Sequence, residues 1–486
     1  MIVVKISEPQ FEYDIHSLVR AFYPGVEVKV SGKDSKMQSE EGMPEFEIEF
    51  QRNGISFCIK DKDERTENHA LFQDPDDRAE IKNDLKMLIY KSLSKYLKKE
   101  LPWGTLTGIR PTKIPMTMLT DQTKEYDEEE ILRLMQEKYA VSEEKGRLSI
   151  AIAKREKELL SRLHYKNGYS LYIGIPFCPT TCLYCSFTSF PISAWADKVD
   201  AYLTALEKEM DATAQLMDGK ILDTVYIGGG TPTTLSVSEL DRLFTKLKAV
   251  FDFSTVQEFT VEAGRADSIT KEKLQVLYEH GVTRISVNPQ TMKEETLKFI
   301  GRKATAAQTA EAYKMAREVG FTNINMDIIL GLPGESEEDV SETIQKIGEL
   351  APDSLTVHSL AVKRASKLSQ WIQVNGIALL HNTEETMEIA AKGAEKMGLV
   401  PYYLYRQKNM SGNFENVGYA AEGKFGIYNI LMMEEVQDIA ALGAGSISKR
   451  LYEGGRIERC ENVKDVAQYI GRIEEMIERK GKLWGD

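Results

Sequence analysis

The sequence has few of the features that would place a protein in a membrane or outside the cell. No apolar run approaches the roughly 20 residues that span a bilayer. The opening stretch, MIVVKISEPQFEYDIH, puts acidic side chains directly after a short apolar run, unlike a secretory signal peptide. We therefore expect a cytoplasmic protein with no membrane span.

Positive charge is also in deficit. The chain has 62 Lys and Arg against 75 Asp and Glu, which gives a formal net charge of −13. Binding to nucleic acid phosphates requires a clustered cationic surface, so we expect no nucleic-acid partner. The acidic balance still allows a local basic pocket for a small anionic molecule.

Cysteine is scarce, with five in 486 residues, but three of them fall close together. Cys178, Cys182 and Cys185 occur in the stretch YIGIPFCPTTCLYCSFTSF. This distribution does not suit a disulfide framework. In a reducing compartment, such a tight group indicates metal ligation or redox chemistry.

The length predicts more than one domain, and the patterns divide the chain into three regions. Residues 1–165 are expected to form an N-terminal α/β domain. In this domain Asn53-Gly54 is a hairpin turn signal, a helix is predicted over 81–100, and charged helices fill roughly 128–164. Residues 401–486 are mixed and are expected to form a C-terminal α+β extension.

The central region, residues 166–400, alternates short apolar runs with longer amphipathic stretches. Six predicted strands cover residues 171–177, 224–230, 258–264, 284–290, 323–331 and 354–361. Strands that alternate with helices form right-handed crossovers and a parallel sheet. Six units are fewer than the eight of a closed barrel, so we predict an α/β fold with a partial (β/α)6 barrel. The chemistry of such barrels lies at the C-terminal ends of the strands.

The spacing of the three central cysteines suits an iron–sulfur cluster. Such clusters usually take four cysteines, but Cys58 and Cys460 lie in other predicted regions. Three ligands on a [4Fe–4S] cluster leave one iron open to another molecule. The alternative is a structural zinc site, although the second pair of ligands that zinc knuckles use is not apparent.

These motifs resemble a known family. CxxxCxxC on the first loop of a partial barrel is the signature of radical S-adenosylmethionine (SAM) enzymes. YIxIPFCxxxCxYCxF followed by GGGTPT is similar to the oxygen-independent coproporphyrinogen III oxidase (dehydrogenase) family. The stretch PWGTLTGIRPTKI, residues 102–114, resembles the HemZ branch.

Several residues at predicted strand ends are candidates for binding SAM. Glycines 228–230, with Thr231, offer close backbone approach and N–H groups for a carboxylate, or form a tight turn. Glu262 could receive an ammonium group, and Arg302 is predicted to begin the helical stretch after the fourth strand. Glu262, Gln290, Arg302 and Asp327 could equally be hydrogen-bonded polar groups of the core.

The resemblance implies a larger set of contacts with this cofactor. The family contacts SAM through Gln, Arg and Asp side chains at intervals that match Gln290, Arg302 and Asp327. By the same resemblance, the cofactor-binding residues are Tyr172, Tyr184, Gly229, Gly230, Thr231, Glu262, Gln290, Arg302, Asp327, Ala361 and Ile447.

The resemblance also implies a reaction. A 5′-deoxyadenosyl radical takes hydrogen from substrate, and two propionates of coproporphyrinogen III become vinyl groups, yielding protoporphyrinogen IX. An electron donor such as flavodoxin or ferredoxin would serve the cluster. Arg110, Lys113 and Arg406 are candidates for binding propionates, with solvated surface cations as the alternative. His358 is a candidate for proton transfer or a core residue.

Two departures from the oxidases keep other functions open. Gly174 stands where the oxidases usually have histidine, and Cys185-Ser186-Phe187 lacks their further cysteine. The latter pattern is shared with the haem-chaperone branch, which binds haem and passes it to acceptor proteins. The alternatives are therefore a haem-trafficking protein, or another radical SAM enzyme that acts on a tetrapyrrole, such as a haem-degrading methyltransferase.

Overall fold

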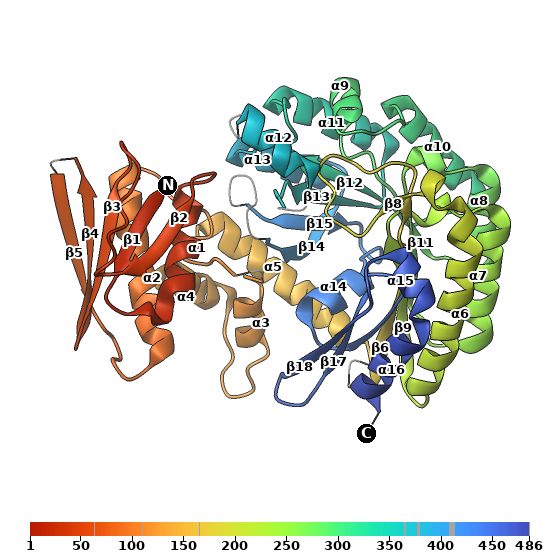
Figure 1. Ribbon diagram of the computed structural model, residues 1–486, viewed down its shortest axis with the longest axis horizontal. Coiled ribbons are helices and arrows are strands. Elements are labelled where there is room, and N and C mark those ends of the chain that lie inside the picture. Colours follow the sequence, from red (N-terminus) through yellow and green to blue (C-terminus); the bar gives the residue numbers. More distant parts are fainter. Residues whose placement is uncertain are drawn as a thin grey trace. The chain divides into compact units, whose positions relative to one another are not determined.

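The computed structural model describes residues 1–62, 64–108, 110–164, 166–363, 366–376, 380–407 and 414–485 (Figure 1). These residues form two compact units. The first comprises Met1–Lys154 with Leu404–Glu415, and the second comprises Arg155–Tyr403 with Asn416–Asp486. The division into regions 1–165, 166–400 and 401–486 stays a prediction. No helix in the described part of the chain has the length and apolar character needed to cross a membrane.

The first unit is built on a five-stranded sheet of order β2-β1-β3-β4-β5. The strands are β1 (Ile2–Ile6), β2 (Val28–Gly32), β3 (Glu45–Gln51), β4 (Gly54–Asp61) and β5 (Glu64–Leu71). β1 runs parallel to β2 and β3, while β3, β4 and β5 are successively antiparallel. The hairpin predicted at Asn53-Gly54 is therefore present between β3 and β4.

Helices complete the first unit. They are α1 (Glu12–Phe22), α2 (Arg78–Leu97), α3 (Lys113–Leu119), α4 (Glu128–Tyr139) and α5 (Glu143–Leu160), of which α5 continues into the second unit. Of these helices, α1 and α2 pack on the sheet. α2 begins three residues before the predicted helix because the Asp77 side chain accepts a hydrogen bond from the Ala79 N–H and caps it. It ends at Lys98, which adopts a left-handed conformation.

The second unit is built on an 11-stranded sheet of order β14-β15-β13-β12-β11-β10-β9-β6-β16-β17-β18. Its central strands are β6 (Gly168–Ile175), β9 (Ile221–Gly229), β10 (Glu258–Gly264), β11 (Arg284–Val287), β12 (Ile324–Leu330) and β13 (Ser354–Ser359). Each of these pairs in parallel with the next. The six parallel strands of the predicted partial barrel are thus confirmed in number, order and direction.

Helices alternate with these strands. They are α6 (Val199–Leu216), α7 (Val237–Val250), α8 (Lys271–Glu279), α9 (Glu294–Phe299), α10 (Ala306–Val319), α11 (Glu337–Leu350), α12 (Lys367–Asn375) and α13 (Glu384–Lys396). Outside the sheet, neighbouring helices pack side by side in the order α6, α7, α8, α10, α11 and α13 (Figure 1). Capping boxes at Ser236, Thr305 and Ser336 start α7, α10 and α11.

The segment after residue 400 extends this sheet at both ends. It contributes β14 (Val400–Tyr405), β15 (Asn416–Ala420), β16 (Asp438–Leu442), β17 (Ile447–Leu451) and β18 (Ile457–Glu461), with α14 (Ile427–Glu434), α15 (Val466–Gly471) and α16 (Ile473–Trp484). β16 pairs in parallel with β6, so a seventh parallel strand joins the six predicted. Its short sequence DIAAL lacks a following amphipathic helix, which is why the βα rhythm did not indicate it.

Candidate functional site

The three clustered cysteines lie on the connection that leaves β6. Cys178 ends the two-residue strand β7 (Phe177–Cys178), which pairs with β8 (Phe190–Pro191). Between these strands, the backbone N–H of Leu183 donates to the Ile300 carbonyl at 3.0 Å, and its carbonyl accepts from the Leu368 N–H at 2.9 Å. The connection is therefore held by the end of α9 and the start of α12.

Burial and neighbouring thiols raise the pKa of two of the three cysteines, Cys178 and Cys185. Burial raises the pKa of Cys178 to about 11, and the nearby charges of Cys185 and Cys182 contribute to this rise. Burial also raises the pKa of Cys185. The thiols therefore lie close enough to interact, and an iron that binds them must displace their protons. Neighbouring thiols that lose their protons to iron are what we expect of residues that bind one iron–sulfur core.

Two arginines face the central cysteine. Nη1 of Arg265 lies 3.7 Å from Sγ of Cys182, and the same guanidinium forms an ion pair of 2.7 Å with Asp267. Arg302 donates to the Asn288 carbonyl at 2.5 Å and to the Tyr184 hydroxyl at 3.3 Å. Burial alone would lower the pKa of Arg302, but Tyr184 and Cys182 raise it above its ordinary value. Sequence reasoning missed Arg265, although it directly follows a strand end in FTVEAGR.

Arg302 has one further donor. Its Nε is buried and has no hydrogen-bond partner among the described residues. A buried guanidinium N–H without an acceptor is costly, so this atom suits a ligand oxygen. The sequence placed Arg302 at the start of a helix, whereas it lies in the connection between α9 and α10.

The three glycines at the end of β9 are explained first by packing. A Cβ at Gly230 would lie 2.5 Å from the Phe177 carbonyl oxygen, and one at Gly228 would lie 2.9 Å from the Glu262 carboxyl. Gly229 has a φ of +106°, a backbone conformation that residues other than glycine rarely adopt. The neighbouring Thr231 donates its N–H to the Phe177 carbonyl at 2.7 Å, and its Oγ1 lies 3.5 Å from Sγ of Cys178. The glycines thus bring the end of β9 against the cysteine-bearing connection.

Glu262 lies on β10 beside these glycines. Its Oε1 accepts a hydrogen bond of 2.5 Å from the Tyr226 hydroxyl. Burial raises the pKa of Glu262 to about 7, and the charge of Asp327 adds to this rise, opposed by hydrogen bonds from Tyr226 and the Gly229 N–H. A carboxyl with a pKa of about 7 that, among the described residues, forms no ion pair with a lysine or arginine suits a cationic ligand group.

Gln290, which follows β11, and Asp327, in the middle of β12, come together. The Gln290 N–H donates to the Asp327 carbonyl at 2.9 Å, and Gln290 has a φ of +67°, which only a small share of non-glycine residues adopt. The Asn325 amide donates to the Asp327 carboxylate at 2.6 Å, and His358 Nε2 lies 3.9 Å from it. Burial would raise the pKa of Asp327, but hydrogen bonds led by that of His358 lower it below the usual value.

Aromatic rings line the same interior. Tyr172 of β6 stacks on Tyr226 and on Tyr428 of α14, with centroids 6.2 Å away in each case. Tyr226 and Tyr428 stack more closely, at 4.5 Å. Sequence reasoning found Tyr172 but missed the other two. The signal for Tyr226 was its position in TVYIGGG, where it alternates with the buried Val225 and Ile227.

Two remaining predicted contacts lie at the edges of this set. Ala361 follows β13 and is partly buried. Ile447 begins β17 and is 42% exposed, which is unusual for a large apolar side chain. The roles of all predicted cofactor contacts stay predictions.

The three candidate propionate-binding cations lie in the first unit. Lys113 is exposed at the start of α3, and its N–H donates to the Arg110 carbonyl at 3.3 Å. Arg406 is buried, donates to the Leu106 carbonyl at 2.5 Å and lies over the Trp103 ring. Burial lowers the pKa of Arg406 to about 10. Arg406 therefore has a packing role within its own unit.

A single metal ion has no evident site. Among the residues that the structure describes, no group of three or more His, Cys, Asp and Glu side chains is arranged to hold one ion. A four-iron cluster places its thiolate ligands on different irons, so this finding concerns mononuclear sites such as zinc. A surface hollow of about 700 Å³ between α6 and α16 contains none of the predicted site residues.

Comparisons with known proteins agree with this geometry. The Radical SAM superfamily matches residues 172–347, the segment from β6 to α11 that carries the cysteines and most of the polar strand ends. The crystal structure of HemN, the coproporphyrinogen III oxidase of Escherichia coli, covers 66% of this chain and 72% of its own, with a TM-score of 0.52 and 24% identity. This likeness shows the shared fold. The fold and the site together define a radical SAM protein.

Similar proteins of known family show to which family of the radical SAM superfamily the chain belongs. The chain is 40% identical over 428 residues to the oxygen-independent coproporphyrinogen-III oxidase-like protein HemZ of Bacillus subtilis, covering 86% of this chain and 84% of HemZ. It is 33% identical over 309 residues to the heme chaperone HemW of the same organism, covering 63% of this chain and 76% of HemW. The chain therefore belongs to the HemN- and HemZ-like family of radical SAM proteins.

Proposed function

We propose that this protein is a radical SAM oxidoreductase that converts two propionates of coproporphyrinogen III to vinyl groups, forming protoporphyrinogen IX without oxygen. The observation that carries the proposal is the placement of the three cysteines. They lie on one short connection, with Arg302 and Arg265 against Cys182 and the end of β9 against Cys178. The family similarity to HemZ supports the tetrapyrrole substrate.

The residues at the strand ends fit the two cofactors of this chemistry. Cys178, Cys182 and Cys185 would hold the [4Fe–4S] cluster, because the three thiols, two of them buried, lie close together on one short segment. The partly ionised Glu262 suits the ammonium group of SAM, and the unpartnered Nε of Arg302 suits an oxygen of the same ligand. When bound, these groups supply a 5′-deoxyadenosyl radical, which accepts the hydrogen atom from the substrate.

The other cofactor contacts are proposed from the resemblance to the family. They are Tyr172, Tyr184, Gly229, Gly230, Thr231, Gln290, Asp327, Ala361 and Ile447. Asp327 stays ionised at neutral pH because His358, Asn325 and Thr356 lower its pKa, so it can accept hydrogen bonds from ligand hydroxyls.

The substrate contacts are proposed more narrowly. Arg110 and Lys113 are candidates for propionate carboxylates, because guanidinium and ammonium groups pair with carboxylates. Arg406 would first have to give up its hydrogen bond to Leu106. A flavodoxin or ferredoxin is the proposed electron donor.

The test is a single-turnover assay on anaerobically reconstituted protein. The mixture contains SAM, dithionite and coproporphyrinogen III, and the products are 5′-deoxyadenosine and vinyl porphyrinogen. Wild-type protein should form both, and Arg110→Ala should raise the KM for the porphyrinogen. Formation of 5′-deoxyadenosine without any decarboxylated product would refute the substrate assignment while leaving the radical chemistry in place.

A second candidate function is haem binding for transfer to other proteins. The similarity to HemW favours it, as do Gly174 and the absence of a further cysteine next to Cys185. Stable haem binding with no vinyl product in the same assay would support this alternative. A methylated tetrapyrrole would instead identify another radical SAM reaction.

A further inference from the structure

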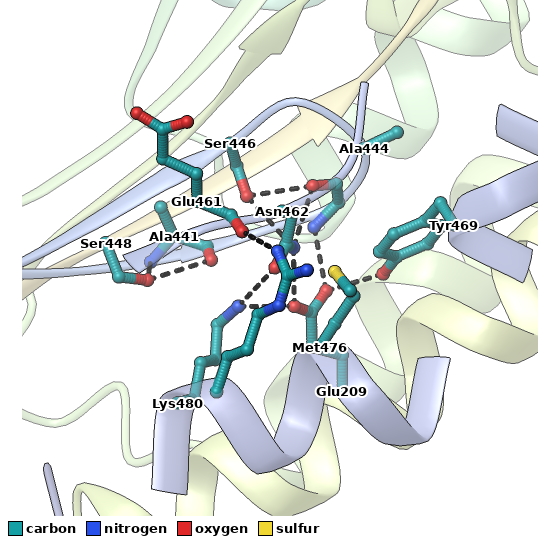
Figure 2. A network of polar contacts seen from close by, with 12 residues as sticks. Glu209, Ala441, Ala444, Ser446, Ser448, Glu461, Asn462, Tyr469, Met476 and Lys480 are labelled. Atoms are coloured by element: carbon teal, nitrogen blue, oxygen red, sulfur yellow. Dashed lines mark hydrogen bonds and ion pairs between the residues drawn. The ribbon is translucent and has the colours of Figure 1, made fainter. Parts of the chain in front are cut away.

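A charged pair is buried where the C-terminal helix packs against the barrel. Nζ of Lys480 on α16 lies 2.5 Å from Oε1 of Glu209 on α6, and the two side chains are 1% and 0% exposed (Figure 2). Replacing such a pair with apolar side chains of similar volume is often neutral or stabilising. Stability of the fold is therefore a weak reason for placing two charges here.

The carboxylate of Glu209 is saturated with donors. Besides Lys480, it accepts from the Asn462 amide at 2.7 Å, the Tyr469 hydroxyl at 2.5 Å and the backbone N–H of Gly443 at 2.8 Å. The Lys480 ammonium also donates to the Asn462 carbonyl oxygen at 3.0 Å. One carboxylate thus joins two helices to the strand ends of β16 and β18.

The backbone that this network holds is the Gly443–Ser446 loop between β16 and β17. Asn462 donates to the Gly443 carbonyl at 2.9 Å, so both polar atoms of Gly443 are fixed by the network. The Asn462 N–H donates to the Ser446 carbonyl at 3.0 Å, and the Gly445 N–H donates to the Val463 carbonyl at 2.9 Å. The loop is therefore tied at each end.

The same loop touches both ends of the cysteine-bearing connection. The Tyr202 hydroxyl donates to the Gly174 carbonyl at 2.6 Å and accepts from the Ala444 N–H at 3.1 Å. Gly174 lies four residues before Cys178. On the other side, a Cβ at Gly445 would lie 2.7 Å from the hydroxyl of Thr188, which lies three residues after Cys185.

We propose that Lys480 and Glu209 are a positioning pair, which fixes the Gly443–Ser446 loop between Gly174 and Thr188 and so sets the geometry of the cysteine-bearing connection and of Ile447 for SAM binding. The proposal rests on the proposed function for its cofactor. Lys480 balances the charge of Glu209, and the carboxylate can then hold the Gly443 N–H in a fully buried site. An apolar pair could fill the same volume but could not accept from Gly443.

The decisive variant is the double replacement Glu209→Leu with Lys480→Met, because it removes both charges and keeps the volume. We expect its thermal unfolding temperature to fall, because the Gly443 N–H, the Asn462 amide and the Tyr469 hydroxyl each lose a buried acceptor. In reconstituted protein, amide hydrogen exchange in peptides covering 443–447 and 172–188 should become roughly tenfold faster, and the KM for SAM should rise roughly tenfold, with a smaller change in kcat.

Two further variants keep the test decisive if the double variant does not fold. Tyr202→Phe keeps the ion pair and the ring but removes the hydroxyl that joins Ala444 to Gly174, and should raise the same KM and exchange rates. Lys482→Met is the matched control on α16, because Lys482 is 74% exposed in its pair with Glu478 and should change neither quantity.

The outcomes separate this proposal from the proposed function. Folded variants with wild-type exchange rates and wild-type KM overturn the positioning role. Wild-type protein that forms no 5′-deoxyadenosine overturns the proposed function, and the exchange measurements then still decide whether the pair orders the two segments. Faster exchange in Lys482→Met as well would also overturn the proposal, because the effect would then not come from the buried pair.

Discussion

Two glutamates of the second unit, Glu209 and Glu262, have opposite surroundings. Glu209 is fully buried, contacts the ammonium group of Lys480 and accepts three further hydrogen bonds. Glu262 accepts from the Tyr226 hydroxyl, and no lysine, arginine or histidine lies within ion-pair distance of it among the described residues. Burial correspondingly raises the pKa of Glu262 to about 7.

This difference indicates that the Glu209 carboxylate has a structural role, whereas the Glu262 carboxylate is available to a ligand. All acceptor positions of Glu209 are used by the chain itself, so it organises backbone. Glu262 lacks a cation of its own and lies beside Asp327, a second carboxylate. A cationic ligand group would relieve both the desolvation and the repulsion at Glu262, which the hydrogen bonds from Tyr226 and the Gly229 N–H offset only in part.

The largest effect is expected from removing a cysteine that would hold the iron–sulfur cluster of the ligand-binding site. Cys182→Ser should abolish 5′-deoxyadenosine formation, a loss greater than the roughly 10- to 100-fold cost of removing a supporting group. Iron and sulfide per chain should fall in parallel. Cys58→Ser is the matched control, because Cys58 is equally buried but lies on β4 in the first unit. Retention of full activity by Cys182→Ser would rule out the proposed cluster.

Glu262→Gln tests the ligand-facing carboxylate directly. The uncharged amide cannot form an ion pair with the ammonium group of SAM. The KM for SAM should therefore rise about 10- to 100-fold at pH 8. Glu209→Gln makes the same chemical change at the other carboxylate. Its effect should appear mainly as lost stability, because it leaves Lys480 buried without its partner. Equal KM values in the two variants would break the comparison.

The pH dependence of stability gives an independent reading of Glu262. Folded Glu262 binds its proton more tightly than an unfolded glutamate of pKa 4.5, so its ionisation destabilises the folded state. This destabilisation is absent below pH 4.5, grows as the pH rises to about 7, and amounts to no more than about 3 kcal/mol. Glu262→Gln should therefore unfold at higher temperature than wild type at pH 8 and at an equal temperature at pH 4. A constant difference across this range would contradict the raised pKa.

The fold of the barrel could be predicted from the sequence, because short apolar strands alternate regularly with amphipathic helices along residues 166–400. The sequence could not indicate β16, which joins β6 from more than 200 residues away without a helix after it. For a similar reason, the sequence alone did not predict the roles of Arg265, Tyr226 and Lys480. Each acts through contacts between distant segments, such as the 271-residue separation of Lys480 and Glu209, and their residue types alone suit exposed or core positions equally well.

Arg302→Lys should produce a smaller loss. Lysine keeps the positive charge near Cys182 but cannot reproduce the hydrogen bonds to Asn288 and Tyr184 together with a free Nε donor. We expect the KM for SAM to rise roughly tenfold with iron content unchanged. Lys303→Gln, at the adjacent exposed position, is the control. Loss of iron in Arg302→Lys would instead assign this arginine to the cluster alone.

The smallest effect is expected from Tyr226→Phe, which removes one donor from Glu262 and keeps the ring stacked on Tyr428. The hydrogen bond from Tyr226 lowers the pKa of Glu262, so its loss should raise that pKa above about 7. The pH at which SAM binding reaches half its maximum should then shift upward, with affinity at pH 7 reduced only about threefold to tenfold. Tyr428→Phe keeps the Tyr226 hydroxyl in place and should leave the pH profile unshifted. If both variants shift the profile equally, the stack of rings, and not the hydroxyl, sets the ionisation of Glu262.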